Sequence, residues 1–170
     1  MKNEKWKVDR KADPNGDVLL LFSQIQKEYL RYCYASIQGE PVRMTDMICI
    51  MFLHEERNNG KDTANEIARR YQMSRSLVSK SVDELRAAGY LTTLREEKDS
   101  RKVHLKLTEK CGPMVERLQK AHDIFVARAT EGFEKQDLAA MQSIAARLRE
   151  NLERFHREEG KGGSAGTLLG

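Results

Sequence analysis

The chain has 170 residues, of which 33% are charged and 39% hydrophobic, and its formal net charge is +4 at pH 7. This size and composition are those of one globular domain, and no stretch approaches the ~20 consecutive apolar residues that a membrane-spanning helix needs. The N-terminal segment lacks the apolar core of a secretory signal, so we expect a cytoplasmic protein without a membrane partner. The 3 cysteines form no C-x-x-C pair, which indicates reduced thiols rather than disulfides or a zinc ribbon.

The positive charge is unevenly distributed along the chain. All of the excess lies in residues 61–110, which hold 12 Lys/Arg and 8 Asp/Glu. A basic segment between neutral ones is typical of a surface that binds a polyanion such as nucleic acid. The alternative is a solvated surface that happens to be positive.

The first part of the chain predicts an arm and three helices. We expect residues 1–16 to be flexible, whereas residues 17–37 repeat apolar side chains every three or four positions, as one face of a helix does. The apolar run 47–53 predicts a buried second helix. Thr63 and Glu66 have the spacing of a capping box, which predicts a short third helix.

The fourth helix, residues 74–88, has the clearest boundaries. Ser74 is a favourable N-cap, and Gly89 stands where a residue with a left-handed backbone ends a helix. The apolar positions predict one buried stripe, so the other side chains face outward. This stripe is predicted to consist of Val78, Val82 and Leu85.

Beyond Gly89 the pattern predicts a hairpin and two long helices. Residues 91–95 and 101–107 are predicted to be strands, joined by a wholly polar turn. Thr108 is predicted to cap a fifth helix, and Pro113 removes a backbone donor near its start, which would delay or bend that helix. A sixth helix is predicted to continue to about residue 157.

These elements predict a mainly α fold with a small β-hairpin wing, a winged helix-turn-helix with N- and C-terminal dimerisation helices. The core is expected at 44–108 and the dimerisation helices at 17–37 and 109–157, all within one domain, residues 17–159. Residues 160–170 are rich in Gly and are expected to be disordered.

The fourth helix has the dimensions of a DNA-reading element. At 1.5 Å per residue it is a rod about 22 Å long that suits the major groove of B-form DNA. Small hydroxyls permit close approach, and Arg75 can bond a guanine edge or a phosphate. The outward side chains are predicted to be Arg75, Ser76, Ser79, Lys80 and Asp83. The alternative is that they are ordinary solvated residues.

The predicted wing carries its own cations, Arg95, Lys98 and Arg101. Asp99 lies two residues before Arg101, so its carboxylate can orient that guanidinium toward the minor groove. The alternative is an exposed salt bridge in a turn, which stabilises little.

The segment from Thr63 to Leu91, with D-S-R at 99–101 and L-T-E-K at 107–110, resembles the multiple-antibiotic-resistance regulator (MarR) family. The motifs cover about fifty residues, and the helix order extends the resemblance over 17–157. The resemblance implies a homodimer that binds pseudo-palindromic double-stranded DNA and is released by a small aromatic ligand or by thiol oxidation. It implies recognition-helix contacts at Ser74, Arg75, Ser76, Ser79 and Lys80, and a wing pair of Asp99 and Arg101. Cys111, Gly112 and Pro113 depart from the family pattern.

A dimer also follows from the apolar faces of the terminal helices, because the core is already supplied by the second to fourth helices. A partner subunit would bury these faces and place two recognition helices about one DNA turn, ~34 Å, apart. The alternative is that the terminal helices fold back on their own subunit.

Two modes of regulation are open. Cys33 is a candidate sensing thiol whose thiolate a tyrosine could stabilise, although a buried cysteine among aromatic residues is the commoner situation. A ligand crevice is the other mode, and each of its candidate residues is otherwise simply a core residue. The candidate ligand-binding residues are Tyr29, Cys33, Met51, Phe52 and His54.

No catalytic motif is present: residues 54–56 do not form H-E-x-x-H, and no phosphate loop or Ser-His-Asp arrangement is found. We therefore predict no enzyme activity, no metal and no cofactor. The predicted function is a DNA-binding transcriptional regulator, a homodimeric repressor released by a small aromatic or hydrophobic ligand. Two alternatives are a redox regulator of the same fold that uses Cys33, and a winged-helix protein-interaction module without specific DNA binding. The basic wing with Arg101 favours DNA.

Overall fold

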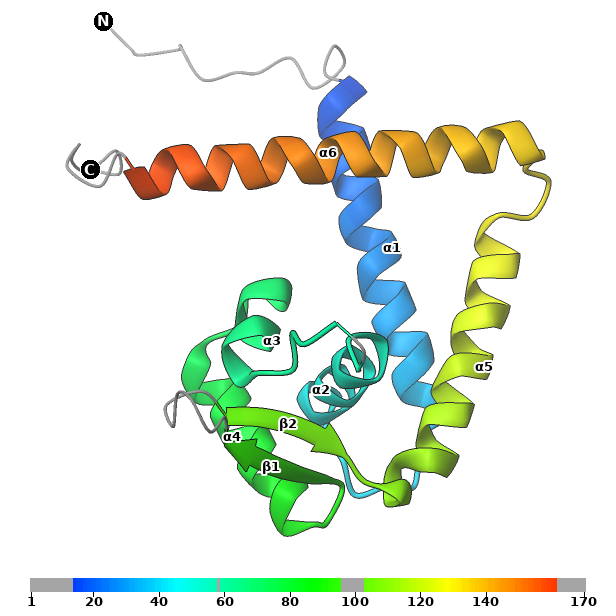
Figure 1. Cartoon of the computed structure of the whole chain (residues 1–170). Helices are drawn as coiled ribbons and strands as arrows, with labels where there is room; N and C mark the ends of the chain where they lie inside the picture. Colours follow the sequence, from blue (N-terminus) through cyan, green and yellow to red (C-terminus); the bar gives the residue numbers. More distant parts are fainter. Residues whose placement is uncertain (1–13, 58, 96–102, 162–170) are drawn as a thin grey trace, which may run out of the picture. The chain divides into compact units, whose positions relative to one another are not determined.

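The computed structural model of the protein describes residues 14–57, 59–95 and 103–161. It is mainly helical with one antiparallel hairpin, which confirms the predicted fold class (Figure 1). The elements are α1 (Pro14–Ser36), α2 (Met44–Glu55), α3 (Ala64–Tyr71), α4 (Arg75–Ala87), β1 (Leu91–Arg95), β2 (Val103–Leu107), a 3₁₀ helix (Glu109–Cys111), α5 (Gly112–Ala129) and α6 (Lys135–Lys161). The chain divides into two compact units, Met1–Ala127 and Arg128–Gly170, and the assignment of 17–159 to one domain stays a prediction.

The core of the first unit is built around α2. Every residue of α2 from Asp46 to Leu53 is buried, as the unbroken apolar run predicts. This helix contacts α1, α4 and β2, and Figure 1 shows it at the centre of the winged-helix elements. Because α2 is buried on all sides, it needs neighbouring elements on all sides, and α1, α4 and β2 are among those that cover it.

The two short helices begin at the predicted caps. The Thr63 hydroxyl accepts the Glu66 backbone N–H at 3.3 Å, but the Glu66 carboxylate bonds Arg69 at 2.5 Å, so the structure shows the threonine half of the capping box. The Ser74 hydroxyl accepts the Leu77 N–H at 3.3 Å, and Gly89 ends α4 with φ of +75°. The stripe of Val78, Val82 and Leu85 is buried as predicted.

The hairpin pairs Leu91 with Leu107 and Arg95 with Val103. Leu91 and Leu105 are buried, which fixes one face of the hairpin on the core. On its other edge, β2 is joined to the loop before α3, because the Leu105 N–H donates to the Asp62 carbonyl at 2.7 Å. The wing strands are therefore fastened to the helical core by backbone as well as by side chains.

The start of the fifth helix differs from the prediction. Thr108 does not cap it: its hydroxyl donates to the Gly89 carbonyl at 2.7 Å, a 3₁₀ turn follows, and α5 begins at Gly112. Pro113 thus lies in the first turn of α5, where a backbone N–H has no partner within the helix and its loss is tolerated. The later start, one of the two outcomes expected from Pro113, is the one observed.

The second unit is dominated by α6, Lys135–Lys161. Its large apolar side chains recur at helical spacing yet are solvent-exposed in the single chain, from 38% for Leu138 to 59% for Leu152. Polar side chains occupy the other faces. Within the described ranges, none of the helices combines the length and the hydropathy that crossing a membrane requires.

Candidate nucleic-acid interface

The outward face of α4 is polar and exposed. Ser74, Ser76, Ser79, Arg75 and Lys80 all lie on the surface. The Ser74 and Ser76 hydroxyl oxygens are 3.2 Å apart, and Ser74 also caps the helix, so its hydroxyl has a structural role as well. Neither Arg75 nor Lys80 forms an ion pair within the described part of the chain. Their charges are uncompensated at the surface that the sequence predicts to face DNA.

One apolar residue on this surface was not predicted. Leu77 is 41% exposed, between Ser76 and the buried Val78. An exposed apolar side chain in a major groove is suited to contact a thymine methyl group. The sequence could have indicated that Leu77 is exposed, because this position falls outside the predicted buried stripe of α4.

The structure describes only part of the wing. Arg95, the last residue of β1, is exposed. Lys98, Asp99 and Arg101 lie outside the described residues, so the predicted pairing of Asp99 with Arg101 stays a prediction.

A buried carboxylate, missed by the sequence reading, holds β2 in place. Asp62 is 3% exposed and bonds both His104 Nδ1 and Lys106 Nζ, the latter at 2.6 Å. Burial alone would raise the pKa of Asp62, but the hydrogen bonds and charges of Lys106 and His104 outweigh it and lower that pKa. The positive charge of Lys106 is therefore balanced inside the protein.

Replacing Asp62 with Asn is expected to lower the free energy of unfolding by about 1 to 3 kcal/mol at neutral pH, because an amide does not balance the charge of the Lys106 ammonium. Since the folded-state pKa of Asp62 is lowered, its stabilisation is present above the unfolded-state pKa and is lost as the pH falls through the folded-state value. Urea unfolding of D62N and wild type at pH 7 and in acid, below the folded-state pKa of Asp62, measures this. The exposed Asp83 gives the matched control, D83N; a D62N deficit of equal size at both pH values would contradict the prediction.

A second buried carboxylate joins α4 to α2. Asp46 accepts the Arg43 backbone N–H at 2.7 Å, the Arg43 guanidinium at 3.1 and 3.2 Å, and the hydroxyl of the fully buried Ser81. The Cys49 thiol in turn donates to Ser81 Oγ at 3.6 Å. Burial would raise the pKa of Asp46, but the bonds from Arg43 and Ser81 lower it. Asp46 and Ser81 thus fix the position of α4 on the core.

A cavity of about 140 Å³ lies beside α2, and three of the five candidate ligand residues, Tyr29, Met51 and His54, line it. Cys33 and Phe52 do not: Cys33 is fully buried, and Phe52 packs edge-on against Tyr71 at 6.3 Å. The sequence reading missed the remaining lining residues, which are Ile50, Glu55, Val115, Leu118, Gln119 and His122.

The polar groups of the cavity come from three helices. The Tyr29 hydroxyl lies 3.0 Å from His122 Nδ1, so α1 and α5 meet at its edge. Burial raises the pKa of both Tyr29 and Glu55, which keeps the phenol neutral and favours a protonated carboxyl more than in water. An apolar floor with a few polar groups is what a small-molecule site requires.

The Cys33 thiol has the environment of a structural residue. It is fully buried, and burial raises its pKa against the opposing hydrogen bond from Tyr29. A sensing cysteine needs an accessible thiolate. The structure therefore provides no support for the redox alternative.

The chain is a winged helix-turn-helix protein. It has two short helices, α3 and α4, followed in the sequence by the β1–β2 hairpin, and the exposed face of α4 is basic. Residues 44–102 match the model of the MarR family. The resemblance to this family that was inferred from the sequence is therefore confirmed over these residues. A comparison with curated proteins gives no match.

Several solved structures have the same fold. A MarR transcriptional regulator from Methanosarcina mazei Go1 is 16% identical, over 81% of this chain and 98% of that one, with a TM-score of 0.66. A MarR family protein from Bacillus stearothermophilus is 17% identical over 81% and 94%, with a TM-score of 0.62. Bordetella bronchiseptica BpsR, whose DNA binding is regulated by 6-hydroxynicotinic acid, is 15% identical over 78% and 92%, with a TM-score of 0.58.

Proposed function

We propose that the protein is a DNA-binding transcriptional regulator, a homodimeric repressor that binds pseudo-palindromic operators. The observation that carries this proposal is the exposed face of α4, where Arg75 and Lys80 form no ion pair with any residue that the structure describes, while the opposite face is buried in the core. A helix whose buried face is anchored to the core and whose exposed face carries cations without ion-pair partners among the described residues is suited to enter a major groove. Ser76, Ser79 and the wing residues Arg95, Lys98, Asp99 and Arg101 complete the proposed contact set.

The exposed apolar faces support the homodimer. On α1, residues 18–22 and Ile25 are exposed, and α6 presents a continuous apolar face. Exposed patches of this kind mark protein interfaces. A symmetric dimer places two copies of α4 on half-sites about one DNA turn, ~34 Å, apart.

The cavity beside α2 supports regulation by a small aromatic or hydrophobic ligand. Its floor is formed by Met51, Leu118 and neighbouring apolar residues, and Tyr29 and His122 can orient a ligand. BpsR, which shares the fold, responds to 6-hydroxynicotinic acid, a small aromatic molecule. A bound ligand at the edge of α5 would act close to the wing strand that precedes this helix.

Selection of bound duplexes from a random pool tests the function directly. We expect the selected sequences to share a two-fold symmetric motif with half-sites one helical turn apart. Recovery of random sequences would contradict specific DNA binding and would favour the protein-interaction alternative.

Replacing Arg75 with Ala is expected to weaken binding to the selected operator by roughly 1 to 3 kcal/mol, because the variant lacks the guanidinium that would bond a base or a phosphate at the start of α4. Fluorescence anisotropy at fixed salt measures the change. The matched control is Lys27→Ala, which removes one exposed cation from α1 and should leave affinity unchanged. Equal losses in both variants would show that only net charge matters.

A further inference from the structure

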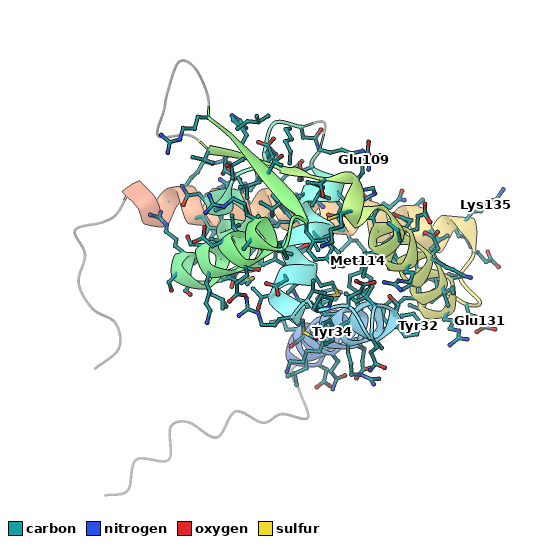
Figure 2. All side chains as sticks on the ribbon, turned by 90° about the horizontal axis from the view of Figure 1, so that it is seen from below. Tyr32, Tyr34, Glu109, Met114, Glu131 and Lys135 are labelled. Carbon is teal, nitrogen blue, oxygen red and sulfur yellow. The ribbon has the colours of Figure 1, made fainter. Side chains whose placement is uncertain are left out.

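Three consecutive backbone carbonyls at the end of α4 accept hydrogen bonds from the turn that connects the hairpin to α5. This turn consists of residues 108–111, and Figure 2 shows Glu109 within it, where the ribbon passes from β2 into α5. The bonds run from the Lys110 ammonium to the Ala88 carbonyl at 2.7 Å, from the Thr108 hydroxyl to the Gly89 carbonyl at 2.7 Å, and from the Thr108 N–H and the Cys111 thiol to the Tyr90 carbonyl at 3.0 and 3.1 Å. The end of α4 is therefore bonded to a segment that lies 19 to 22 residues later in the chain.

The helix does not supply these bonds itself. It closes in a Schellman motif, in which the Tyr90 N–H donates to the Leu85 carbonyl at 2.9 Å and the Gly89 N–H donates to the Arg86 carbonyl at 3.0 Å. A helix leaves its last carbonyls without partners, and those beyond the left-handed Gly89, with φ of +75°, lie outside its ladder of hydrogen bonds. The 108–111 turn supplies the donors that these carbonyls need.

Lys110 adds a charge effect to its hydrogen bond. Its ammonium lies at the C-terminal end of α4, where the aligned peptide dipoles favour a cation, and 4.5 Å from the centre of the Tyr90 ring. Tyr90 is 4% exposed and its hydroxyl donates to Glu40 at 3.3 Å, so the ring is fixed against the core. Lys110 therefore joins the end of α4 to the start of α5 through a carbonyl, an aromatic ring and the helix dipole.

This junction gives α4 a second fixed point. The first is near the middle of the helix, where the buried Ser81 bonds Asp46 of α2. A rod that is held at one point can pivot, and a pivot of about 10° at Ser81 would move Arg75, ~9 Å away along the helix, by about 1.5 Å. Such a displacement exceeds the ~0.5 Å range over which a hydrogen bond keeps its geometry. Bonds at the end of α4 remove this freedom and fix the direction of the helix.

We propose that Lys110 and Thr108 are positioning residues of the DNA interface. Without touching DNA, they hold the end of α4 against the start of α5 and so set the angle at which the exposed face of α4 meets the major groove. This inference rests on the proposed function, because it assigns both residues a role in sequence-specific binding.

Lys110→Met tests the positioning role, because methionine keeps an unbranched side chain but removes the donor and the charge. Lys120→Met is the matched control, since it removes the same charge from an exposed position of α5. Fluorescence anisotropy measures the affinity of each variant for the selected operator and for a random duplex. We expect K110M to lose about three- to tenfold more operator affinity than K120M, whereas the two variants bind the random duplex equally, because non-specific binding depends on charge.

Two further variants separate the hydrogen bonds from the charge. Lys110→Arg retains a cationic donor and should restore most of the operator affinity that K110M loses. Thr108→Val removes the hydroxyl donor without a change in charge, so it should weaken operator binding by a few-fold and leave random-duplex binding and its salt dependence unchanged. Circular dichroism establishes that each variant is folded before the titrations.

Three results would overturn the proposal or its basis. Equal operator affinities of K110M and K120M would show that the lysine has a structural role only. Equal losses of operator and random-duplex affinity in K110M, with a shallower salt dependence than in K120M, would identify Lys110 as a direct phosphate contact. Failure of the wild type to bind any operator would overturn the proposed function. Amide hydrogen exchange at Gly89 and Tyr90 then still decides the junction: we expect faster exchange in K110M than in K120M, and equal rates would exclude it.

Discussion

A variant with Leu148 and Leu152 replaced by Glu is expected to be monomeric and to lose two orders of magnitude or more in operator affinity. These leucines are 44% and 59% exposed on the apolar face of α6, and a charge there prevents the burial that a partner subunit would provide. Two recognition helices on one dimer bind at high effective concentration, an advantage of roughly 10² to 10⁴ that a monomer lacks. Light scattering coupled to gel filtration reports the mass, and anisotropy reports the affinity.

The matched control carries the same charge change on the opposite face of α6. Ser143→Glu with Ala146→Glu should leave the oligomeric state and operator binding unchanged, since both positions are exposed away from the apolar face. A dimer that survives the leucine substitutions would exclude α6 as the interface. A monomer with undiminished affinity would exclude the two-site mode of binding.

Replacing Asp46 with Ala is expected to lower the free energy of unfolding by about 2 to 4 kcal/mol, the largest stability effect predicted for a single substitution. The substitution leaves the Ser81 hydroxyl, which is fully buried, without its carboxylate acceptor, and removes the group that caps the Arg43 backbone N–H. Urea unfolding followed by circular dichroism measures the change.

Asp83→Ala is the control for this substitution. Asp83 lies exposed on α4 and pairs with Arg86 at 3.0 Å, an interaction worth well under ~1 kcal/mol. If D46A and D83A unfolded at the same urea concentration, the buried link between α2 and α4 would contribute nothing beyond an ordinary surface pair.

The bounds and the buried face of α4 could be predicted because nearby residues in the sequence determine them. Ser74 and Gly89 define its ends through their own backbone preferences, and the spacing of the apolar residues between them defines its buried face. Ser79 and Ser81 show the limit of such reasoning. Both are small hydroxyl residues of one helix, yet Ser79 is exposed and Ser81 is fully buried, because an aspartate 35 positions earlier in the chain accepts its hydrogen bond.

The candidate sites show the same limit. Tyr29, Met51 and His54 could be assigned to a crevice, but the α5 wall of that cavity, including His122, depends on how distant helices pack. Asp62 was missed for the same reason, since its two partners lie more than 40 residues away. The start of α5 was misplaced because the Thr108 hydroxyl is bonded to the turn after α4.

The internal pairing of cations has a consequence for counterion release. Arg69, Arg86 and Lys106 already pair with carboxylates of the same chain, so they are expected to displace fewer of the cations condensed on DNA than unpaired residues do. Residues 61–110 contain 12 Lys/Arg, but only the unpaired ones add fully to the slope of log affinity against log salt. We therefore expect the proposed association with a duplex to weaken less steeply with ionic strength than the basic composition of this segment suggests.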